Sequence, residues 1–482
     1  MKKILLVLIA AAALCRVSAQ QEERVPSWAN ETKEQKAERM AWWTHDRFGM
    51  FIHWGLYSLP ARHEWVKQYE RISDENYNRY FEYFNPDLYN PKQWAAYAKA
   101  AGVKYMVVTT KHHEGFCMWD TKYTDFKVTN TPYGKDLIGP LVEAFRAEGI
   151  RVGFYYSLID WHHPDFTYDR QHPNGPRDPK ERAEANKSRD MDKYRQYMKN
   201  QLTELLTQYG QIDELFLDFS YPGKDGKGHE DWDSEGLIKL ARELQPQIII
   251  NNRSDLQDTS WGWDFLTPEQ YIPYEGLKIN GESVPWEMCQ TFDGRSWGYS
   301  RDGQTWKSAR QLIVMLIEAV SKGGNLLLNV GPTARGEFEP RAVERLEAIA
   351  EWMKYHSRSI YGCTHAPAGI EAPNNCLLTY NPETNRLYVH VLEWPFKSLH
   401  LPGLEGKIKY AQLLNDASEM TYYSRTAANA GEHTVEISRA GDLIMPVPVR
   451  KPDVEVPVIE IMLKPGFAPS YIYNNVWMVK NV

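Results

Sequence analysis

The sequence predicts an α/β fold, an irregular (β/α)8-like barrel followed by a C-terminal antiparallel β-sandwich. Up to residue 362, apolar runs of strand length alternate about seven times with segments of helical periodicity. This alternation favours a parallel barrel over an open sheet, although eight clean repeats cannot be found. Beyond Gly362 the pattern changes to short alternating runs separated by turn residues, which is typical of an antiparallel sandwich of roughly 100 residues. We therefore expect a barrel over residues 20–362 and a sandwich over residues 363–482.

The N-terminus has the three parts of a secretory signal peptide. Two lysines precede an apolar run from Ile4 to Leu14, and Val17-Ser-Ala19 has the form of a cleavage site. We expect cleavage after Ala19, so that residues 1–19 are removed and the protein is secreted or periplasmic. The run is too short to span a bilayer and no other segment has about 20 apolar residues, so an integral membrane protein is not expected. A lipid anchor at Cys15 is disfavoured because bulky Leu14 precedes it.

The net charge and the aromatic content indicate which kinds of binding partner suit this protein. Three of the 56 Lys and Arg residues lie in the signal peptide, so 53 remain against 63 Asp and Glu, a net charge of −10. Nucleic acid is a poor partner for such a surface. The 17 Trp and 29 Tyr residues suit either stacking against sugar rings or a core rich in aromatic residues.

Four cysteines lie outside the signal peptide: Cys117, Cys289, Cys363 and Cys376. Their spacing fits neither a zinc cluster nor a disulfide framework. A bond between Cys363 and Cys376 is possible in an oxidising compartment, but buried free thiols are favoured.

The expected elements follow one another in order along the chain. The barrel strands are expected at 47–53, 104–113, 151–157, 214–218, 247–253, 286–292 and 326–330. The barrel helices are expected at 91–101, 136–148, 191–209, 234–244, 309–320 and 341–356. The sandwich strands are expected at 377–380, 386–392, 408–414, 433–437 and 456–463. Within this order, the continuous apolar run Leu215-Phe-Leu217 is typical of a strand buried on both faces. Gly149 closes the expected helix 136–148, before the strand 151–157.

Polar side chains stand at the C-terminal ends of the expected barrel strands. They are His53, His112 with His113, Tyr155 or Tyr156, Asp218 and Arg253. The C-terminal ends of parallel barrel strands meet at one face, where such folds carry their chemistry. The opposite ends of the same strands show no matching set. We therefore expect these side chains to form one site.

Loops between the strands add acids and aromatic rings to this face. Glu64 and Trp65 follow the first strand, whereas Glu269, Glu287 and Trp297 come later. Asp218 with a loop glutamate makes the carboxyl pair that glycoside cleavage requires, in which one acid attacks the anomeric carbon or activates water and the other protonates the departing oxygen. Neutral histidines and an arginine can bind sugar hydroxyls, and Trp or Tyr rings can cover the apolar face of a sugar.

Several ordered motifs resemble the retaining α-L-fucosidase family of glycoside hydrolases. They are Phe51-Ile-His-Trp-Gly-Leu-Tyr-Ser58, Lys111-His-His-Glu-Gly-Phe116, Phe216-Leu-Asp218, Thr267-Pro-Glu-Gln270, and Trp286-Glu-Met-Cys289 with Ser296-Trp-Gly-Tyr299. The resemblance runs from about Trp42 to Gly362 and implies an imperfect barrel followed by a β-sandwich. It also implies an exo-acting enzyme that hydrolyses terminal α-linked L-fucose from glycans with retention, through a covalent fucosyl-enzyme intermediate, and without a metal or other cofactor.

The resemblance implies roles for particular residues. Asp218 is the expected nucleophile and Glu269 the expected acid/base. Glu287 is the reserve for the second role, although a buried partner of a neighbouring arginine is the favoured reading for it. Glu64 is a third possibility, expected rather as a ligand for a hydroxyl group. The residues expected to bind the substrate are His53, Glu64, Trp65, His112, His113, Tyr156, Arg253, Glu287 and Trp297.

Two other functions are compatible with parts of the sequence. A metal-dependent hydrolase could use His53, His112, His113 and Asp218. It is disfavoured because adjacent residues point to opposite sides of a regular strand, so that His112 and His113 would not share a ligand easily. The other is a carbohydrate-binding protein without turnover. The leaving-group sugar is expected to depend on loops 220–233 and 274–284, and the sequence predicts no oligomeric state.

Overall fold

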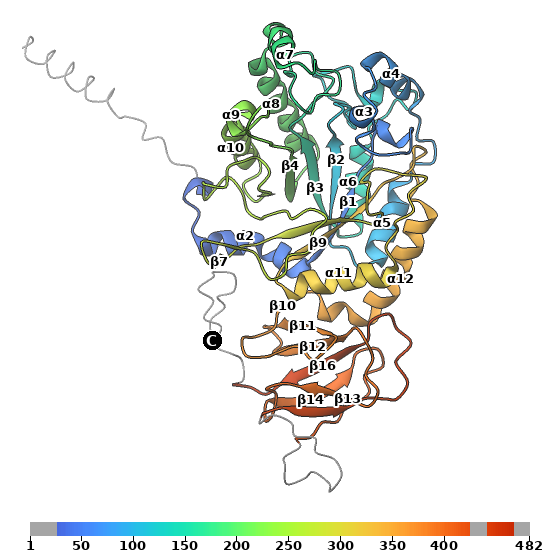
Figure 1. Cartoon of the computed structure of the whole chain (residues 1–482), viewed down its shortest axis with the longest axis vertical. Coiled ribbons are helices and arrows are strands. Elements are labelled where there is room, and N and C mark those ends of the chain that lie inside the picture. Colours follow the sequence, from blue (N-terminus) through green and yellow to red (C-terminus); the bar gives the residue numbers. More distant parts are fainter. Residues whose placement is uncertain (1–26, 425–440, 467–482) are drawn as a thin grey trace, which may run out of the picture.

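Seven parallel strands form the inner sheet of the larger part of the molecule (Figure 1). The computed structural model describes residues 27–424 and 441–466. The strand order is β5-β4-β3-β2-β1-β9-β8. The strands are β1 (Phe48–Ile52), β2 (Tyr105–Lys111), β3 (Arg151–Ser157), β4 (Glu214–Asp218), β5 (Ile249–Ile250), β8 (Glu287–Thr291) and β9 (Asn325–Val330). The predicted barrel strands are thus confirmed, except that only two residues of 247–253 are in a strand.

An irregular segment closes the gap between the two edge strands. Asn251, directly after β5, bridges Phe265, and Leu266 bridges Trp286 directly before β8. Glu269 then bridges Cys289 within β8. All three bridges are parallel, so residues 265–269 take the place of an eighth strand. This explains why eight regular repeats cannot be found in the sequence.

Helices cover the outside of the sheet (Figure 1). The barrel helices with predicted counterparts are α5 (Pro91–Ala100), α6 (Ile138–Ala147), α8 (Met191–Gln208), α10 (Ser234–Leu244), α11 (Ala309–Ser321) and α12 (Pro340–His356). The others are α2 (Lys33–Asp46), α3 (Val66–Tyr69), α4 (Asp74–Tyr83), α7 (Pro179–Ala185) and α9 (His229–Trp232). Short sequence motifs mark where some of these helices begin. Ser308 and Gln311 form a capping box at the start of α11, and α5 starts at a proline after the N-cap Asn90.

The alternation of side chains along β4 divides the barrel interior into levels. Glu214, Phe216 and Asp218 are two residues apart and share the inner face of the strand. Phe216 packs in an inner cluster with Phe51 and Tyr155. Asp218 therefore lies at the C-terminal end of the interior, and Glu214 lies at the opposite end.

Glu287 also lies at that opposite end, because it is the first residue of β8. It is fully buried and accepts a short hydrogen bond from the Tyr105 hydroxyl. Glu214 is buried near it, and among the described residues neither of its carboxyl oxygens has a hydrogen-bond partner. Burial raises the pKa of Glu287 to about 8, and burial followed by the charge of Glu287 raises that of Glu214. The prediction that Glu287 serves the site is therefore corrected, and its partners are a tyrosine and an acid instead of an arginine.

The C-terminal strands form two antiparallel sheets below α11 and α12 (Figure 1). The larger sheet has the order β10-β11-β12-β16-β14, and the smaller sheet pairs β13 with β15. The strands are β10 (Thr364–His365), β11 (Cys376–Asn381), β12 (Arg386–Val391), β13 (Ser398–Leu401), β14 (Ile408–Leu413), β15 (Leu443–Pro446) and β16 (Val458–Leu463). A separate hairpin, β6 (Lys278–Ile279) with β7 (Glu282–Ser283), belongs to the barrel loops.

The larger sheet packs on the barrel helices, as the absence of a linker suggested. Tyr388 and Val458 belong to the same hydrophobic cluster as the barrel core, and Trp352 of α12 donates a hydrogen bond to the carbonyl of Val456 at 2.8 Å. The opposite face of the sheet, with Leu387 and Val389, forms the separate core of the sandwich.

Three other predictions concern the termini, the cysteines and the membrane. The signal peptide, Cys15 and the expected strand 433–437 lie outside the described residues. The four cysteines at 117, 289, 363 and 376 are buried and unpaired, which confirms the prediction of free thiols. In the part of the chain that the structure describes, no helix is long and apolar enough to cross a bilayer.

The buried acid pair predicts an unusual dependence of stability on pH. Because the folded pKa of Glu287 lies above its unfolded value, the folded chain keeps a proton that the unfolded chain loses between about pH 4.5 and 8. The free energy of unfolding should therefore fall as the pH rises through this interval, by up to about 1.4 kcal/mol per pH unit. Glu287→Gln keeps an acceptor for Tyr105 and cannot ionise, so it should raise Tm more at pH 8 than at pH 5.

Thermal unfolding at the two pH values checks this prediction. Glu275→Gln is the matched control, because the Glu275 side chain is 73% exposed and, among the described residues, forms an ion pair only with Lys278. Equal shifts in Tm at pH 5 and pH 8 for Glu287→Gln would contradict the retention of a proton on Glu287 in the folded chain.

Candidate active site

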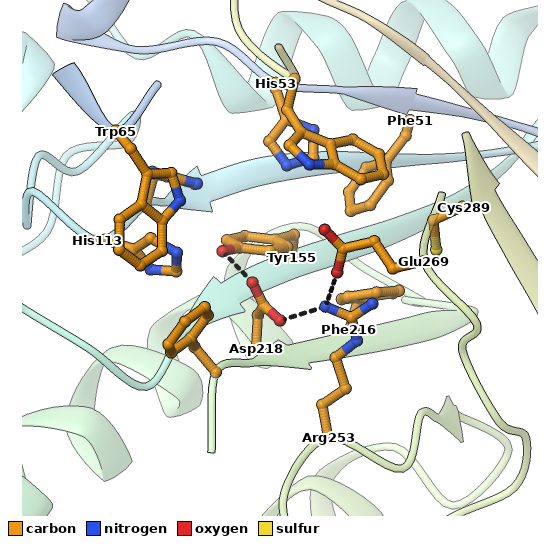
Figure 2. Close-up of a pocket in the computed structure, with 13 residues that line it drawn as sticks. Phe51, His53, Trp65, His113, Tyr155, Phe216, Asp218, Arg253, Glu269 and Cys289 are labelled. Carbon is orange, nitrogen blue, oxygen red and sulfur yellow. Dashed lines mark hydrogen bonds and ion pairs between the residues drawn. The ribbon is translucent and has the colours of Figure 1, made fainter. Parts of the chain in front are cut away.

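A pocket opens at the C-terminal ends of the barrel strands (Figure 2). Its lining residues are Phe51, His53, Trp65, His112, His113, Tyr155, Phe216, Asp218, Phe219, Arg253, Glu269, Cys289 and Trp297. Most of the residues expected at the site are therefore brought together here. The pocket is small, mostly enclosed by aromatic rings, and contains two carboxyl groups.

Asp218 is held at the floor of the pocket by two donors. The Tyr155 hydroxyl donates to Oδ2 at 2.8 Å, and Nη1 of Arg253 donates to Oδ1 at 2.8 Å. Burial, followed by the charge of Asp218, raises the pKa of Tyr155 well above its usual value, so the phenol stays protonated and keeps donating. The carboxylate is fixed in one orientation as a result.

The end of β4 that carries Asp218 is held by a side chain instead of a strand. β5 ends at Ile250, and the amide of Asn251 then replaces its backbone: Nδ2 donates to the carbonyl of Leu217 at 2.9 Å, and Oδ1 accepts from its N–H at 3.1 Å. The backbone N–H and carbonyl of Leu217, the residue before Asp218, are therefore both hydrogen-bonded, although β5 has already ended.

Glu269 faces Asp218 across the same guanidinium (Figure 2). Its Oε2 lies 2.7 Å from Nη1 of Arg253, the nitrogen that is 2.8 Å from Oδ1 of Asp218. These two oxygens can therefore be at most 5.5 Å apart. The side chain of Glu269 is 42% exposed and that of Asp218 only 10%, so Glu269 lies at the mouth of the pocket and Asp218 at its base.

Arg253 is itself fixed by the irregular segment that closes the barrel. Its Nε donates to Oγ1 of Thr267 at 2.8 Å, and its Nη2 to the carbonyl of Thr267 at 3.3 Å. Although burial lowers the pKa of Arg253, the charges of Asp218 and Glu269 raise it above its usual value. The guanidinium is a permanent positive charge between the two acids.

His53 presents a hydrogen-bond acceptor to the pocket. The amide of Asn329 donates from Nδ2 to the carbonyl of Trp297 at 2.6 Å, so its Oδ1 accepts from Nδ1 of His53 at 2.6 Å. Burial, and then the charge of His112, hold the pKa of His53 well below its usual value. The ring is neutral, with its proton on Nδ1 and the lone pair of Nε2 left for a ligand.

His113 has the same tautomer for a similar reason. The Ser157 hydroxyl lies 2.8 Å from the carbonyl of Ile159, which can only accept, so Oγ accepts from Nδ1 of His113 at 2.7 Å. Burial, and then the charge of His112, lower the pKa of His113 well below its usual value. The pocket thus has at least two neutral imidazoles that can accept bonds from hydroxyl groups.

His112 and His113 both line the pocket, which corrects the expectation that they point to opposite sides. β2 ends at Lys111, and its register against β3 shifts between Thr109 and Lys111. Beyond this irregularity the two rings lie side by side, with centroids 4.1 Å apart. Nonetheless, among the residues that the structure describes, no three His, Cys, Asp or Glu side chains form a group that could hold a metal ion.

Aromatic rings form two walls of the pocket. Trp297 packs against His53 at 5.1 Å and Phe51 at 5.9 Å between ring centroids. On the other wall, Trp65 packs against His113 at 4.9 Å and Phe219 at 5.1 Å. These walls are suited to the apolar parts of a sugar ring.

Two of the expected binding residues lie behind the pocket wall. The Tyr156 hydroxyl donates to Gln201 of α8 at 2.8 Å, because Tyr156 faces the helices and Tyr155 faces the interior. Tyr155 therefore replaces Tyr156 at the site. Oε2 of Glu64 accepts bonds from the backbone N–H groups of Trp297 and Gly298 at 2.9 and 3.1 Å, so Glu64 positions the loop that carries Trp297. Its role as a ligand for a hydroxyl group stays a prediction.

Sequence reasoning missed several residues of the site. Asn329 and Ser157 set the histidine tautomers, and Phe219 supplies part of a wall. The position of Asn329 at the end of an apolar strand was a usable signal, because it matches the rule that found Asp218. Phe219 carried no signal, since its ring reaches the pocket only through a backbone with φ of +81°.

Comparisons with known proteins agree with this geometry. A family model described as Alpha-L-fucosidase matches residues 11–358. The bovine tissue alpha-L-fucosidase is 31% identical over 385 residues, which cover 74% of this chain and 75% of that protein. The structure of alpha-L-fucosidase isoenzyme 1 from Paenibacillus thiaminolyticus is 43% identical with a TM-score of 0.81, over 90% of this chain and all of that one. A Bacteroides thetaiotaomicron alpha-L-fucosidase, trapped as a covalent intermediate, is 29% identical with a TM-score of 0.75, over 89% of this chain and 96% of that one. The chain belongs to the α-L-fucosidase family of glycoside hydrolases.

Proposed function

We propose that this protein is an exo-acting α-L-fucosidase that hydrolyses terminal α-linked L-fucose from glycans with net retention. Asp218 is the nucleophile and Glu269 the acid/base. The observation that carries the proposal is the pair of carboxyl groups on one nitrogen of Arg253, with nearest oxygens at most 5.5 Å apart. Retaining glycosidases hold their carboxyl groups about 5 to 5.5 Å apart, whereas inverting enzymes leave room for a water molecule.

In the first step, an oxygen of Asp218 attacks the anomeric carbon as the glycosidic bond breaks. The proton of Glu269 passes to the departing oxygen, and the sugar becomes an ester of Asp218. Before this step Asp218 is charged and Glu269 is neutral; after it Asp218 is an ester and Glu269 is charged. Because oxygens of both carboxyls lie within 2.8 Å of Nη1 of Arg253, the guanidinium faces one negative charge in both states. No charge is left uncompensated as the intermediate forms.

In the second step, Glu269 takes a proton from water, and the resulting hydroxide attacks the anomeric carbon. The ester bond breaks, fucose leaves with its original anomeric configuration, and Asp218 is again a carboxylate. The exposure of Glu269 supports this role, because the water has to arrive from the solvent side. Two inversions at one carbon produce the net retention.

Sugar recognition is assigned to the remaining walls. His53 and His113 accept bonds from ring hydroxyls through Nε2, while the aromatic walls pack against the apolar parts of the sugar. A small pocket with Glu269 at its mouth suits a terminal residue, which supports exo action. The substrate is thus a glycan or glycoconjugate that ends in fucose.

We also propose that the protein is exported. The basic start, the apolar run and the Val17-Ser-Ala19 sequence support removal of residues 1–19 and a secreted or periplasmic location. Such a location would give the enzyme access to glycans outside the cytoplasm.

Replacement of the nucleophile tests the mechanism directly. Asp218→Ala should lower kcat for 4-nitrophenyl α-L-fucoside at least 10³-fold, in the range seen when a group that forms the covalent intermediate is removed. Added azide should restore part of the turnover and yield the β-configured fucosyl azide, because only one displacement then occurs. Near-normal turnover by Asp218→Ala would refute the assignment.

Replacement of Glu269 tests the acid/base role. Glu269→Ala should slow hydrolysis of an unactivated fucosyl disaccharide by about 10²- to 10⁴-fold, the usual contribution of such a group, and an activated aryl fucoside by much less. Azide should yield the α-configured product with this variant. Glu275→Ala, a change in the following loop, is the matched control and should keep wild-type rates. Equal losses for both substrates would argue against proton donation by Glu269.

A further inference from the structure

Glu114 is a buried carboxyl group behind the wall of the active-site pocket, and the proposed mechanism gives it no role. It is 1% exposed, and its Oε2 lies 3.3 Å from Nδ1 of His112, which lines the pocket. We propose that Glu114 is a positioning residue that keeps His112 as an imidazolium, so that His112 donates a charged hydrogen bond from Nε2 to a hydroxyl oxygen of the sugar. The inference rests on the proposed fucosidase activity.

The three pocket histidines differ in the chemical group that faces Nδ1. His53 bonds the amide of Asn329, and His113 bonds the hydroxyl of Ser157. Neither partner carries a charge, which agrees with the neutral state of both rings. Nδ1 of His112 faces a carboxyl group instead. A carboxylate favours the protonated form of a neighbouring imidazole, and a carboxylic acid ordinarily loses its proton at a lower pH than an imidazolium. The proton of the pair therefore belongs to His112.

Glu114 needs this imidazolium to compensate its own charge. In the described part of the chain neither of its oxygens makes a hydrogen bond, and its only ion pair is the one with His112. The ammonium group of Lys111 is directed to Asp160 instead, at 3.2 Å. An ionised carboxyl group that is buried alone is strongly destabilising. With His112 charged, the pair has no net charge and this cost is removed.

The other titratable groups around the pair are neutral. The rings packed against His112, at 4.1 to 5.7 Å between centroids, are those of His53, Tyr57, His113 and Tyr155. Burial, and then the charge of Glu114, raise the pKa values of Tyr57 and Tyr77 well above their usual value, so both phenols keep their protons. The charge of His112 is, after burial, the main cause that lowers the pKa values of His53 and His113. One charged imidazole thus keeps its two neighbours neutral.

The backbone brings the two side chains together in a tight turn after β2. The N–H of Gly115 donates to the carbonyl of His112 at 3.0 Å, and Glu114 lies within this turn. Gly115 has a φ of +86°, and a Cβ atom there would overlap Oδ1 of Asp160. On the opposite side, a Cβ atom on Gly55 would lie 3.0 Å from Oε1 of Glu114. Both glycines therefore allow the chain to close around the acid beside the imidazole.

A charged donor between two neutral acceptors gives the hydrogen bonds of the pocket a direction. The ring of His112 lies 4.1 Å from that of His113 and 5.7 Å from that of His53, between centroids. A sugar hydroxyl can accept a bond from Nε2 of His112 and donate its own proton to Nε2 of a neighbouring ring. Hydrogen bonds from charged donors are roughly twice as strong as those from neutral ones. Glu114 therefore strengthens sugar binding without touching the sugar.

Glu114→Gln tests this role, because glutamine has nearly the same shape and no charge. With L-fucose as the probe, the Kd from calorimetry should rise about tenfold at pH 7.5, as expected when a charged hydrogen bond becomes a neutral one. The rise should be smaller at pH 5.5, because acid supplies the second proton of the imidazole even without the carboxylate. Glu204→Gln is the matched control: it replaces a buried carboxyl group that bonds Trp119 and Lys122, and should keep the Kd within about twofold.

A double-variant cycle separates this role from a merely structural one. Because Glu114 acts through His112, adding Glu114→Gln to His112→Gln should change the Kd for L-fucose by no more than about twofold. Additive effects of the two changes would overturn the inference. A rise in Kd for Glu114→Gln that is equal at both pH values would overturn it as well.

The wild-type protein provides a test that holds even where Glu114→Gln misfolds. NMR of 15N-labelled histidine at pH 7.5 should show one imidazole that has protons on both nitrogens and responds to L-fucose, and this signal should be absent from His112→Gln. The inference is wrong where every imidazole that responds to L-fucose is neutral. Normal hydrolysis of 4-nitrophenyl α-L-fucoside with an unchanged Kd in Glu114→Gln refutes this inference alone. A wild-type protein that neither hydrolyses the fucoside nor binds L-fucose refutes the proposed function.

Discussion

The geometry of the site depends on one guanidinium group held between two carboxyl groups. Nη1 of Arg253 donates a hydrogen bond to Asp218 and forms an ion pair with Glu269, and so limits their separation. The same side chain is anchored to Thr267, which lies on the same segment as Glu269. Glu269 and the cation are therefore positioned together by the closing segment, while β4 and Tyr155 hold Asp218.

The irregularity of the barrel is what allows this arrangement. β5 is only two residues long, and residues 265–269 bridge their neighbours at isolated positions. A regular strand would alternate its side chains strictly between the interior and the helices, and would leave fewer of them at the rim. Here Asn251 replaces the ladder with its side chain, Arg253 reaches Asp218, and Glu269 reaches the mouth of the pocket. The bulge in β2 has a similar effect, because it allows both His112 and His113 to face the pocket.

The two ends of the barrel interior show how surroundings decide what a carboxyl pair does. Glu214 and Glu287 are buried without an ion pair among the described residues, so burial raises their pKa values and favours their protonated forms. Asp218 and Glu269 have Arg253 between them and an opening to solvent at Glu269. The first pair lies inside the barrel away from solvent, whereas the second lies beside a cation, is accessible and is suited to chemistry. The number of carboxyl groups is the same, but their access to water and to a positive charge differs.

The sequence by itself determined the order of the elements and the face that carries the chemistry. Periodicity and end signals are local, so β3 and α10 match their predicted bounds, and the strand-end rule placed His53, Asp218 and Arg253 at one pocket. Only the tertiary structure decided which of two neighbours faces inward. Because side chains alternate along a strand, Tyr155 and Tyr156 must point to opposite sides of β3. The packing of α8 against the strand decides that Tyr155 is the one that faces the barrel interior. The position of Glu287 followed from where β8 begins to pair with β9, and the position of Phe219 followed from one left-handed residue. These features depend on contacts between segments far apart in the chain, and no local pattern encodes them.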